Sequence, residues 1–201
     1  MGCDIHSVGQ IRRNGKWESI VPRPGGDDRN YDSFAVMADV RNGEGFAGCD
    51  TGEGWPVMFP PRGLPEDCVI DSDYYIRTSE PFYWSFDEKK EKPEYDIWIG
   101  DHSHSWLSLD ELLIIQERFK DKEYEIHGML TLEQMSDLQK GKAPDSWCAW
   151  TNQYDHLKAK WKVPAIKRLK TLNKMIEALE SLRDKNGLKN EDVRVVFGFD
   201  S

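Results

Sequence analysis

The chain has 201 residues, of which 38% are hydrophobic and 31% are charged, and its formal net charge is −9. This composition excludes general disorder, and the negative charge disfavours non-specific binding to duplex DNA. No apolar run reaches membrane-spanning length, no signal-peptide pattern opens the sequence, and the four cysteines are widely spaced, so we expect a cytoplasmic protein with reduced thiols.

The first part of the chain predicts a β-hairpin followed by a short helix. A strand over about 3–13 runs into Asn14-Gly15, which is the strongest short signal for a hairpin turn, and a second strand is expected over about 16–21. After a Pro- and Gly-rich loop, helical spacing of apolar residues predicts a helix over 31–40.

The next part of the chain loses this periodicity. Residues 41–80 are rich in Gly and Pro but also hold aromatic residues, so we expect an ordered loop region that lies against the core. A charged connector over 86–96 leads to a short strand that enters a polar turn around "DHSHS". Ser108 with Glu111 forms a capping-box pattern that predicts a helix to about residue 119.

The last part of the chain predicts two helices and a closing strand. Thr131 with Gln134 begins a helix over 132–140, and residues 142–162 have an irregular pattern. The clearest helix begins at Pro164 and ends before Gly187. The β-branched and aromatic run over 192–200 predicts a strand in a central position.

This order of elements favours an α+β fold, because strands lie at both ends of the chain and helices lie between them. We expect a small, mostly antiparallel sheet that includes both terminal strands near its middle, with helices packed on one side. The whole of residues 1–201 is expected to form one domain with a loop-rich insertion over about 41–100. Pairing of the terminal strands would bring Asp200 close to the opening strand.

Histidines and carboxylates gather at two places in the sequence. In an extended strand, Asp4 and His6 share one face because side chains alternate. His102 and His104 follow Asp101 in a second cluster. Imidazole and carboxylate groups are ligands of hydrolytic metal sites, where a bound ion activates water and polarises a phosphoryl oxygen. A structural role, in turns, in caps or on a solvated face, is the alternative.

Two arginines and a tryptophan are the candidates for holding an anionic group. Arg41 and Arg62 stand in the Gly-rich region beside aromatic residues, and Trp106 follows the second histidine cluster. Arginine forks, backbone amides and aromatic faces are what a nucleotide pocket uses. The alternative is that both arginines pair with the acidic residues of the same region.

The D-x-H of Asp4 and His6 resembles the opening motif of calcineurin-like metallophosphoesterases, and "DHSHS" resembles their closing G-H-x-H motif. This resemblance implies that Asp4, His6, His102 and His104 are metal ligands. The chain has neither the G-D-x-x-D nor the G-N-H-[DE] motif of that family.

Longer phrases resemble another group of proteins over nearly the whole length of the chain. They are "MGCDIH", "VRNGEGFAGCDTGEG", "PRGLPED", "DHSHSWLSLDELL" and "DVRVVFGFD". Together they resemble a family of small proteins found mainly in bacteriophage and prophage genomes. The resemblance implies a viral protein that acts in the cytoplasm of the bacterial host, and it implies no mechanism.

The leading hypothesis is a metal-dependent hydrolase that acts on a phosphodiester or nucleotide-type substrate, with a divalent ion such as Zn, Mn or Mg as cofactor. The four ligands named above would hold the ion, and Asp50 or Asp101 would complete the site or act as base. The alternative is a non-catalytic counter-defence protein that sequesters a nucleotide signal or inhibits a host protein. The expected partners are therefore a small anionic ligand or a host protein, and neither duplex DNA nor a membrane.

Overall fold

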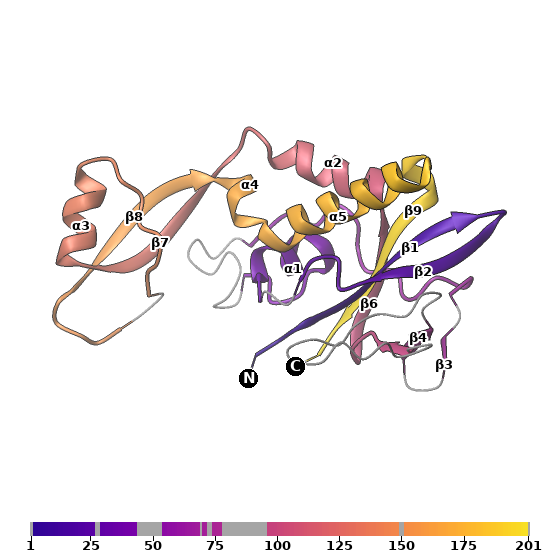
Figure 1. The fold of residues 1–201 in the computed structure, drawn as a ribbon. Coiled ribbons are helices and arrows are strands. Elements are labelled where there is room, and N and C mark those ends of the chain that lie inside the picture. The colour runs from indigo at the N-terminus through magenta and orange to yellow at the C-terminus, as the bar shows by residue number, and fades with distance from the viewer. Residues whose placement is uncertain are drawn as a thin grey trace, which may run out of the picture. The chain divides into compact units, whose positions relative to one another are not determined.

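The computed structural model describes residues 2–26, 29–43, 54–68, 70–71, 74–77, 96–148 and 151–200 (Figure 1). The chain divides into two compact units. The first unit comprises Met1–Arg29, Phe59–Ile115 and Thr171–Ser201, and the second comprises Asn30–Met58 and Gln116–Lys170. The expectation of a single domain with an insertion over 41–100 stays a prediction.

The first unit is built on a four-stranded antiparallel sheet with the strand order β2-β1-β9-β6. These strands are β1 (Ile5–Arg13), β2 (Lys16–Pro22), β6 (His102–Ser108) and β9 (Val193–Phe199). The first and last strands of the chain are therefore the two central ones, and every residue of β9 is buried. This confirms the expected α+β fold with both terminal strands in one antiparallel sheet.

The turn between β1 and β2 is the predicted hairpin. Asn14 has a φ of 51° and Gly15 a φ of 77°, so both turn residues adopt the left-handed conformation of the tight turns that match strand twist. Register pairs run from Arg13 with Lys16 to Val8 with Pro22, with one irregularity between Gly9 and Gln10. The Asn14-Gly15 motif therefore predicted this turn correctly.

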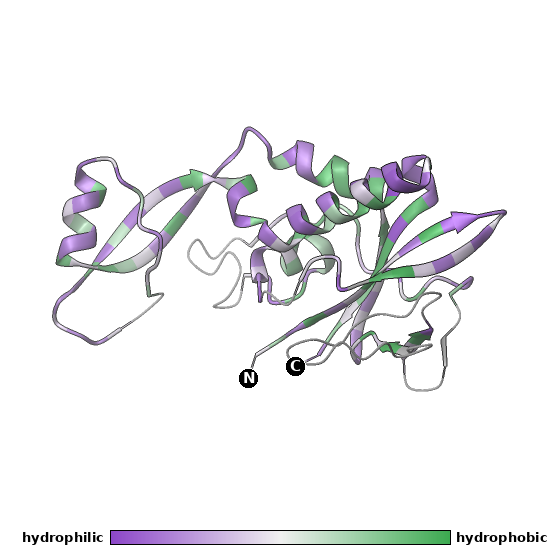
Figure 2. Ribbon diagram, in the orientation of Figure 1, coloured by the Kyte–Doolittle hydropathy of each residue, from purple (hydrophilic) through white to green (hydrophobic). Residues whose placement is uncertain are grey.

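Helices cover one face of this sheet (Figure 1). They are α2 (Leu109–Phe119), which continues into the second unit, and α5 (Lys170–Asn186). The inward residues of α5 are all buried: Thr171, Leu172, Met175, Ile176, Leu179 and Leu182. Hydrophobic and hydrophilic residues accordingly alternate along the ribbon of α5 (Figure 2). A short 3-10 helix over Asn190–Asp192 connects α5 to β9.

The opposite face of the sheet carries a second apolar layer. A three-stranded antiparallel sheet packs there, formed by β3 (Ile70–Asp71), β4 (Tyr75–Arg77) and β5 (Asp96–Trp98). Its core cluster joins both sheets: Val8, Cys68, Ile76, Ile97, Ile99 and Val196. The main sheet is thus apolar on both faces along its middle, and polar side chains concentrate toward its ends.

The second unit contains a pair of antiparallel strands that the sequence pattern did not predict. Strand β7 (Glu123–Thr131) pairs with β8 (His156–Pro164), with α3 (Leu132–Gln139) between them in sequence. The expectation of irregular structure over 142–162 is therefore wrong from His156 onward. There, lysines alternate with Leu157, Ala159 and Trp161, as polar and apolar residues do in a half-buried strand.

Three further helix boundaries are settled by the structure. The helix expected from Pro164 is instead α4 (Ala165–Arg168) and α5, which are separated at Leu169. Helix α1 spans Tyr31–Ala38, and α3 has the complete predicted capping box between Thr131 and Gln134. Within the described ranges, no helix combines the length and the apolar character needed to cross a membrane.

Gly198 is a position where the fold leaves no room for a side chain. A Cβ there would overlap the carbonyl oxygen of Ile99, which is backbone and cannot turn away. We expect Gly198→Ala to lower the free energy of unfolding by about 2–3 kcal/mol. Urea denaturation measures this, with Gly9→Ala as the control because its Cβ would meet the flexible Leu179 side chain at 3.1 Å. Equal losses in both variants would contradict the prediction.

Candidate functional site

The beginning of β1 and the end of β9 are joined by a reciprocal set of hydrogen bonds. The backbone N–H of Asp4 donates to Oδ1 of Asp200 at 2.9 Å, and the backbone N–H of Asp200 donates to the carbonyl oxygen of Asp4 at 3.2 Å. The pairing of the two strands therefore continues one step beyond its last ladder pair, Ile5 with Phe199. The expectation that Asp200 lies beside the opening strand is confirmed.

His6 lies on the same face as this contact. It is opposite Gly198 in the register, and its Nε2 is 3.1 Å from Oδ2 of Asp200. The imidazole is mostly buried, with a side-chain exposure of 16%, and its ring centroid is 4.6 Å from that of Trp98. A carboxylate that fixes one ring nitrogen of a histidine sets the orientation of the ring, as in sites where imidazole binds or transfers a proton.

Arg29 holds the other carboxylate of the site. Its Nε and Nη2 donate to the two oxygens of Asp4, a two-pronged geometry that arginine forms with carboxylates. This hydrogen-bonded ion pair lowers the pKa of Asp4 from its ordinary value. Gly2 provides the space for Arg29, because a Cβ at Gly2 would collide with the guanidinium group. Asp4 is therefore a paired carboxylate.

Arg23 is positioned by the loop that follows β2. Its backbone N–H donates to the carbonyl oxygen of Ser7 at 2.8 Å, and its carbonyl oxygen accepts from Gly26 at 2.9 Å. The turn between them is anchored on α5, because Gly25 has room only for hydrogen beside Thr171 and Met175. The start of the Pro- and Gly-rich loop therefore lies beside β1, and Arg23 is close to the N-terminal end of that strand.

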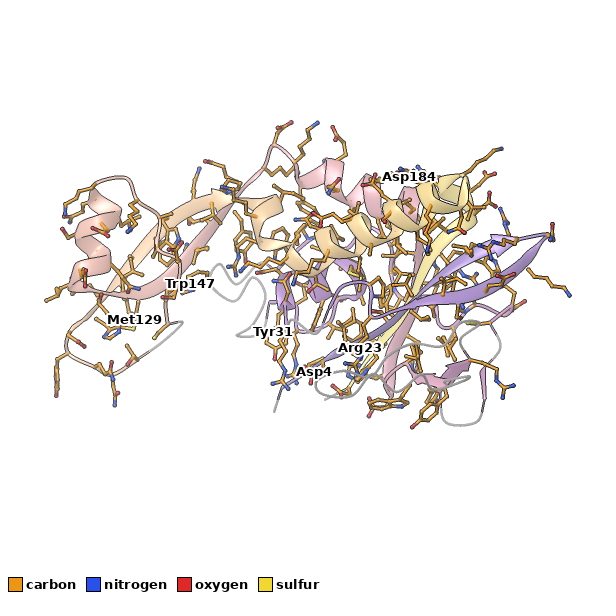
Figure 3. The ribbon with its side chains drawn as sticks, viewed as in Figure 1. Asp4, Arg23, Tyr31, Met129, Trp147 and Asp184 are labelled. Atoms are coloured by element: carbon orange, nitrogen blue, oxygen red, sulfur yellow. The ribbon has the colours of Figure 1, made fainter. Side chains whose placement is uncertain are left out.

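These groups surround a cavity of about 330 Å³ that is lined by Asp4, Ile5, His6, Arg23 and Arg29. We call it the terminal-strand cavity. Figure 3 labels Asp4 and Arg23, which come from different segments of the first unit and lie at the same end of the sheet. The volume is at the lower limit of pockets that hold small ligands. Two guanidinium groups and an imidazole in one such cavity are suited to an anion.

The two histidines of the second cluster point to different faces because β6 contains a bulge. The register shifts between His102 and Ser105, and Ser103 has a φ of 51°. His102 is therefore opposite Phe199 and stacks on its ring at 6.1 Å, on the helix-covered face. His104 lies beside Gly198 on the face of His6. The "DHSHS" segment begins a strand, so the predicted polar turn there is wrong.

The four predicted metal ligands are thus arranged in two groups. Asp4, His6 and His104 lie on one face of the sheet, and His102 on the other. His104 Nε2 is 3.0 Å from the carbonyl oxygen of Gly100, and His102 Nδ1 is 3.0 Å from Ser103 Oγ. In the part of the chain that the structure describes, no group of three or more His, Cys, Asp or Glu residues could hold a metal ion.

Arg62 and Trp106 form a contact of their own on β6. The guanidinium carbon of Arg62 is 3.8 Å from the ring centroid of Trp106, and Arg62 Nη2 donates to the Trp106 carbonyl oxygen at 2.7 Å. Arg62 also forms an ion pair with Glu111. The two residues therefore lie together but do not line the terminal-strand cavity, and their role in holding an anion stays a prediction.

The remaining predicted residues lie elsewhere. Asp101 is exposed, and its backbone N–H donates to the carbonyl oxygen of Phe199 at 2.8 Å. Arg41 follows α1 in the second unit and has a φ of 56°. Asp50 lies outside the described residues, so its predicted role stays a prediction.

Sequence reasoning did not select Arg23, Arg29 and Trp98. The available signal for the arginines was their place at the two ends of the loop "RPGGDDR", directly after a strand expected to pair with β1. Trp98 had no motif around it, because its contact with His6 depends on the small sheet.

Comparison of the chain with protein-family models, with curated proteins and with solved structures gives no match. What the site can do has to follow from its own residues.

Glu111 provides a test of the Arg62 contact. Its carboxylate accepts from the Ser108 backbone N–H at 2.8 Å and from Arg62, and it completes the predicted capping box. Burial raises the pKa of Glu111, but the hydrogen bonds from Arg62 and Ser108 outweigh it, so the pKa is lowered overall from 4.5. We expect Glu111→Gln to cost about 1–2 kcal/mol of unfolding free energy at pH 7.

The pH dependence follows from the direction of that shift. A carboxylate with a lowered folded pKa contributes stability that is complete above its unfolded value and is lost as pH falls through the folded one. The difference between the wild type and Glu111→Gln should therefore shrink below pH 4.5 in urea titrations. Glu133→Gln is the control, because Glu133 is an exposed first-turn residue of α3. A loss at pH 7 no larger than that of the control would refute the assignment.

Proposed function

We propose that the terminal-strand cavity binds a small anionic ligand that carries a phosphate or a similar group. The observation that carries the proposal is the presence of two arginine side chains, Arg23 and Arg29, in one cavity of about 330 Å³. Guanidinium groups form charge-assisted, often two-pronged hydrogen bonds with phosphate oxygens, and these are among the strongest polar contacts of proteins.

The surroundings of the arginines support this proposal. The Asp4 carboxylate is paired with Arg29, and the Asp200 carboxylate accepts from the Asp4 backbone N–H and lies 3.1 Å from His6 Nε2. Both negative charges are thus engaged with groups of the protein itself. A bound phosphate would bring negative charge into a cavity that Arg23, Arg29 and His6 line.

This proposal corresponds to the non-catalytic alternative of the sequence hypotheses, a protein that sequesters a small anionic ligand. The bacteriophage origin, the cytoplasm of the host as the place of action, and a role in counter-defence stay predictions.

A metal-dependent hydrolase is a second proposal, and one observation favours it. Asp4 and His6, two of its four predicted ligands, line the same cavity, and Asp200 orients the imidazole of His6. A histidine held in this way can accept a proton from water. The two proposals differ in the fate of the ligand, because a binder returns it intact after denaturation and a hydrolase returns its products.

We expect Arg23→Gln and Arg29→Gln each to weaken the binding of inorganic phosphate about 10-fold, because each removes a charge-assisted hydrogen-bond donor. Titration calorimetry at low salt measures this. Arg13→Gln is the matched control, since Arg13 lies at the far end of β1 and pairs with Glu18. Absence of phosphate binding to the wild type, or equal affinity in all variants, would rule the proposal out.

The hydrolase proposal has its own test. If Asp4 and His6 hold Zn²⁺, Mn²⁺ or Mg²⁺, the added ion should raise the Tm, and a chelator should reverse the rise. Asp4→Asn should abolish the rise, whereas Asp137→Asn, in α3 of the second unit, should leave it unchanged. A Tm that none of the ions changes would exclude a resident metal of this kind.

A further inference from the structure

Two exposed tyrosines lie at the start of β4, which pairs with β5, and Trp98 of β5 contacts His6 of the terminal-strand cavity. Tyr74 is 47% exposed and Tyr75 is 39% exposed. They account for two of the six large hydrophobic side chains that are exposed in the described part of the chain. Tyr75 pairs with Trp98, and we call Tyr74, Tyr75 and Trp98 together the aromatic platform. Adjacent exposed aromatic groups indicate a surface that contacts a ligand or partner.

The register of the small sheet sets the face on which Tyr75 and Trp98 lie. Tyr75 is opposite Trp98 in the register, and the next pair, Ile76 with Ile97, enters the apolar core between the sheets. Because side chains alternate along strands, Tyr75 and Trp98 share the face opposite the two isoleucines, and at the end of β5 the Trp98 ring also reaches His6. The platform is therefore a consequence of the same alternation that buries the two isoleucines.

Tyr74 is held in a conformation that tyrosine rarely adopts. Its φ is 63°, and its ring stacks on His104 with centroids 4.5 Å apart and an interplanar angle of 26°. Strained backbone of this kind tends to occur at functional sites. His104 is the histidine that the β6 bulge turns to the face of His6, so the bulge also determines where this ring pair lies.

His6 connects the platform to the cavity. The residue lines the cavity, and its ring is in contact with Trp98 at a centroid distance of 4.6 Å. A ligand that fills the cavity beside His6 is thus one imidazole ring away from an indole ring.

We propose that the anionic ligand is a nucleoside phosphate, whose phosphate lies between Arg23 and Arg29 and whose base stacks on the aromatic platform. This inference rests on the proposed function and names its ligand class. The Asp4 carboxylate, whose two oxygens already accept from Arg29, keeps further lone pairs of the kind that accept from a ribose hydroxyl. Stacking on an aromatic ring is available to every base, so the platform recognises the presence of a base more than its identity.

The test compares ligands that share a phosphate and differ in the base. Inorganic phosphate, ribose 5-phosphate and the four ribonucleoside 5′-monophosphates are titrated separately into the full chain. We expect the nucleotides to bind about 10-fold or more tightly than ribose 5-phosphate, which is the usual effect of stacking one base. Equal affinity of nucleotides and ribose 5-phosphate would overturn this inference and leave the phosphate site in place. If none of the phosphates binds, both proposals fail.

Variants identify the surface responsible for the difference. Trp98→Leu and Tyr75→Leu should each lower the ratio of nucleotide affinity to ribose 5-phosphate affinity toward one. Tyr75→Leu is the safer of the two for folding because Tyr75 is exposed, and Tyr154→Leu, at the fully exposed Tyr154 of the second unit, is the control. A preference that survives in both platform variants would overturn the inference. A nucleoside that binds as tightly as its phosphate, unaffected by Arg23→Gln, would overturn the phosphate site.

Discussion

The antiparallel pairing of β1 with β9 is the constraint on which the candidate site depends. Its register places His6 opposite Gly198, and one step further it brings Asp4 and Asp200 into contact. A slip of one residue would turn either strand's side chains to the other face of the sheet and separate His6 from Asp200. The two residues are 194 positions apart in the chain, so no local element of structure could replace this pairing.

Two features away from the site hold that register. Val8 and Val196 are opposite each other and are buried in the core between the sheets, where a slip would expose them. At the far end, Arg194 is 3% exposed, donates to Gln10 and Asp67, and stacks on Trp17 at 3.9 Å. A buried guanidinium that lost these partners would be costly, because an unpaired charge is poorly tolerated away from water. The apolar middle of the sheet and the paired Arg194 thus hold the strand register. The opposite end of the sheet can therefore carry polar groups suited to a ligand.

The sequence predicted the features that depend on neighbouring residues. The Asn14-Gly15 turn, both capping boxes and the central position of the closing strand follow from local conformation and side-chain type, and the structure confirms them. The sequence failed where tertiary contacts decide. A single extra residue, Ser103, sends His102 and His104 to opposite faces, and no periodicity marks such a bulge in advance. Arg23 and Arg29 reach the site because of the course of the loop that holds them. Its Pro and Gly content predicts a loop but does not predict where the backbone runs.

His6 is the residue at which the fold and the proposed binding chemistry meet. One nitrogen of its ring is set by Asp200 and hence by strand pairing, one side of the residue borders a cavity with two arginines, and the ring touches Trp98. A ligand bound there would contact groups from β1, from the loop after β2 and from β5, and would therefore connect the two sheets as well as the terminal strands. Ligands that bind only the folded state stabilise it by mass action. The same contacts that recognise a nucleoside phosphate would thus strengthen the strand pairing that creates the site.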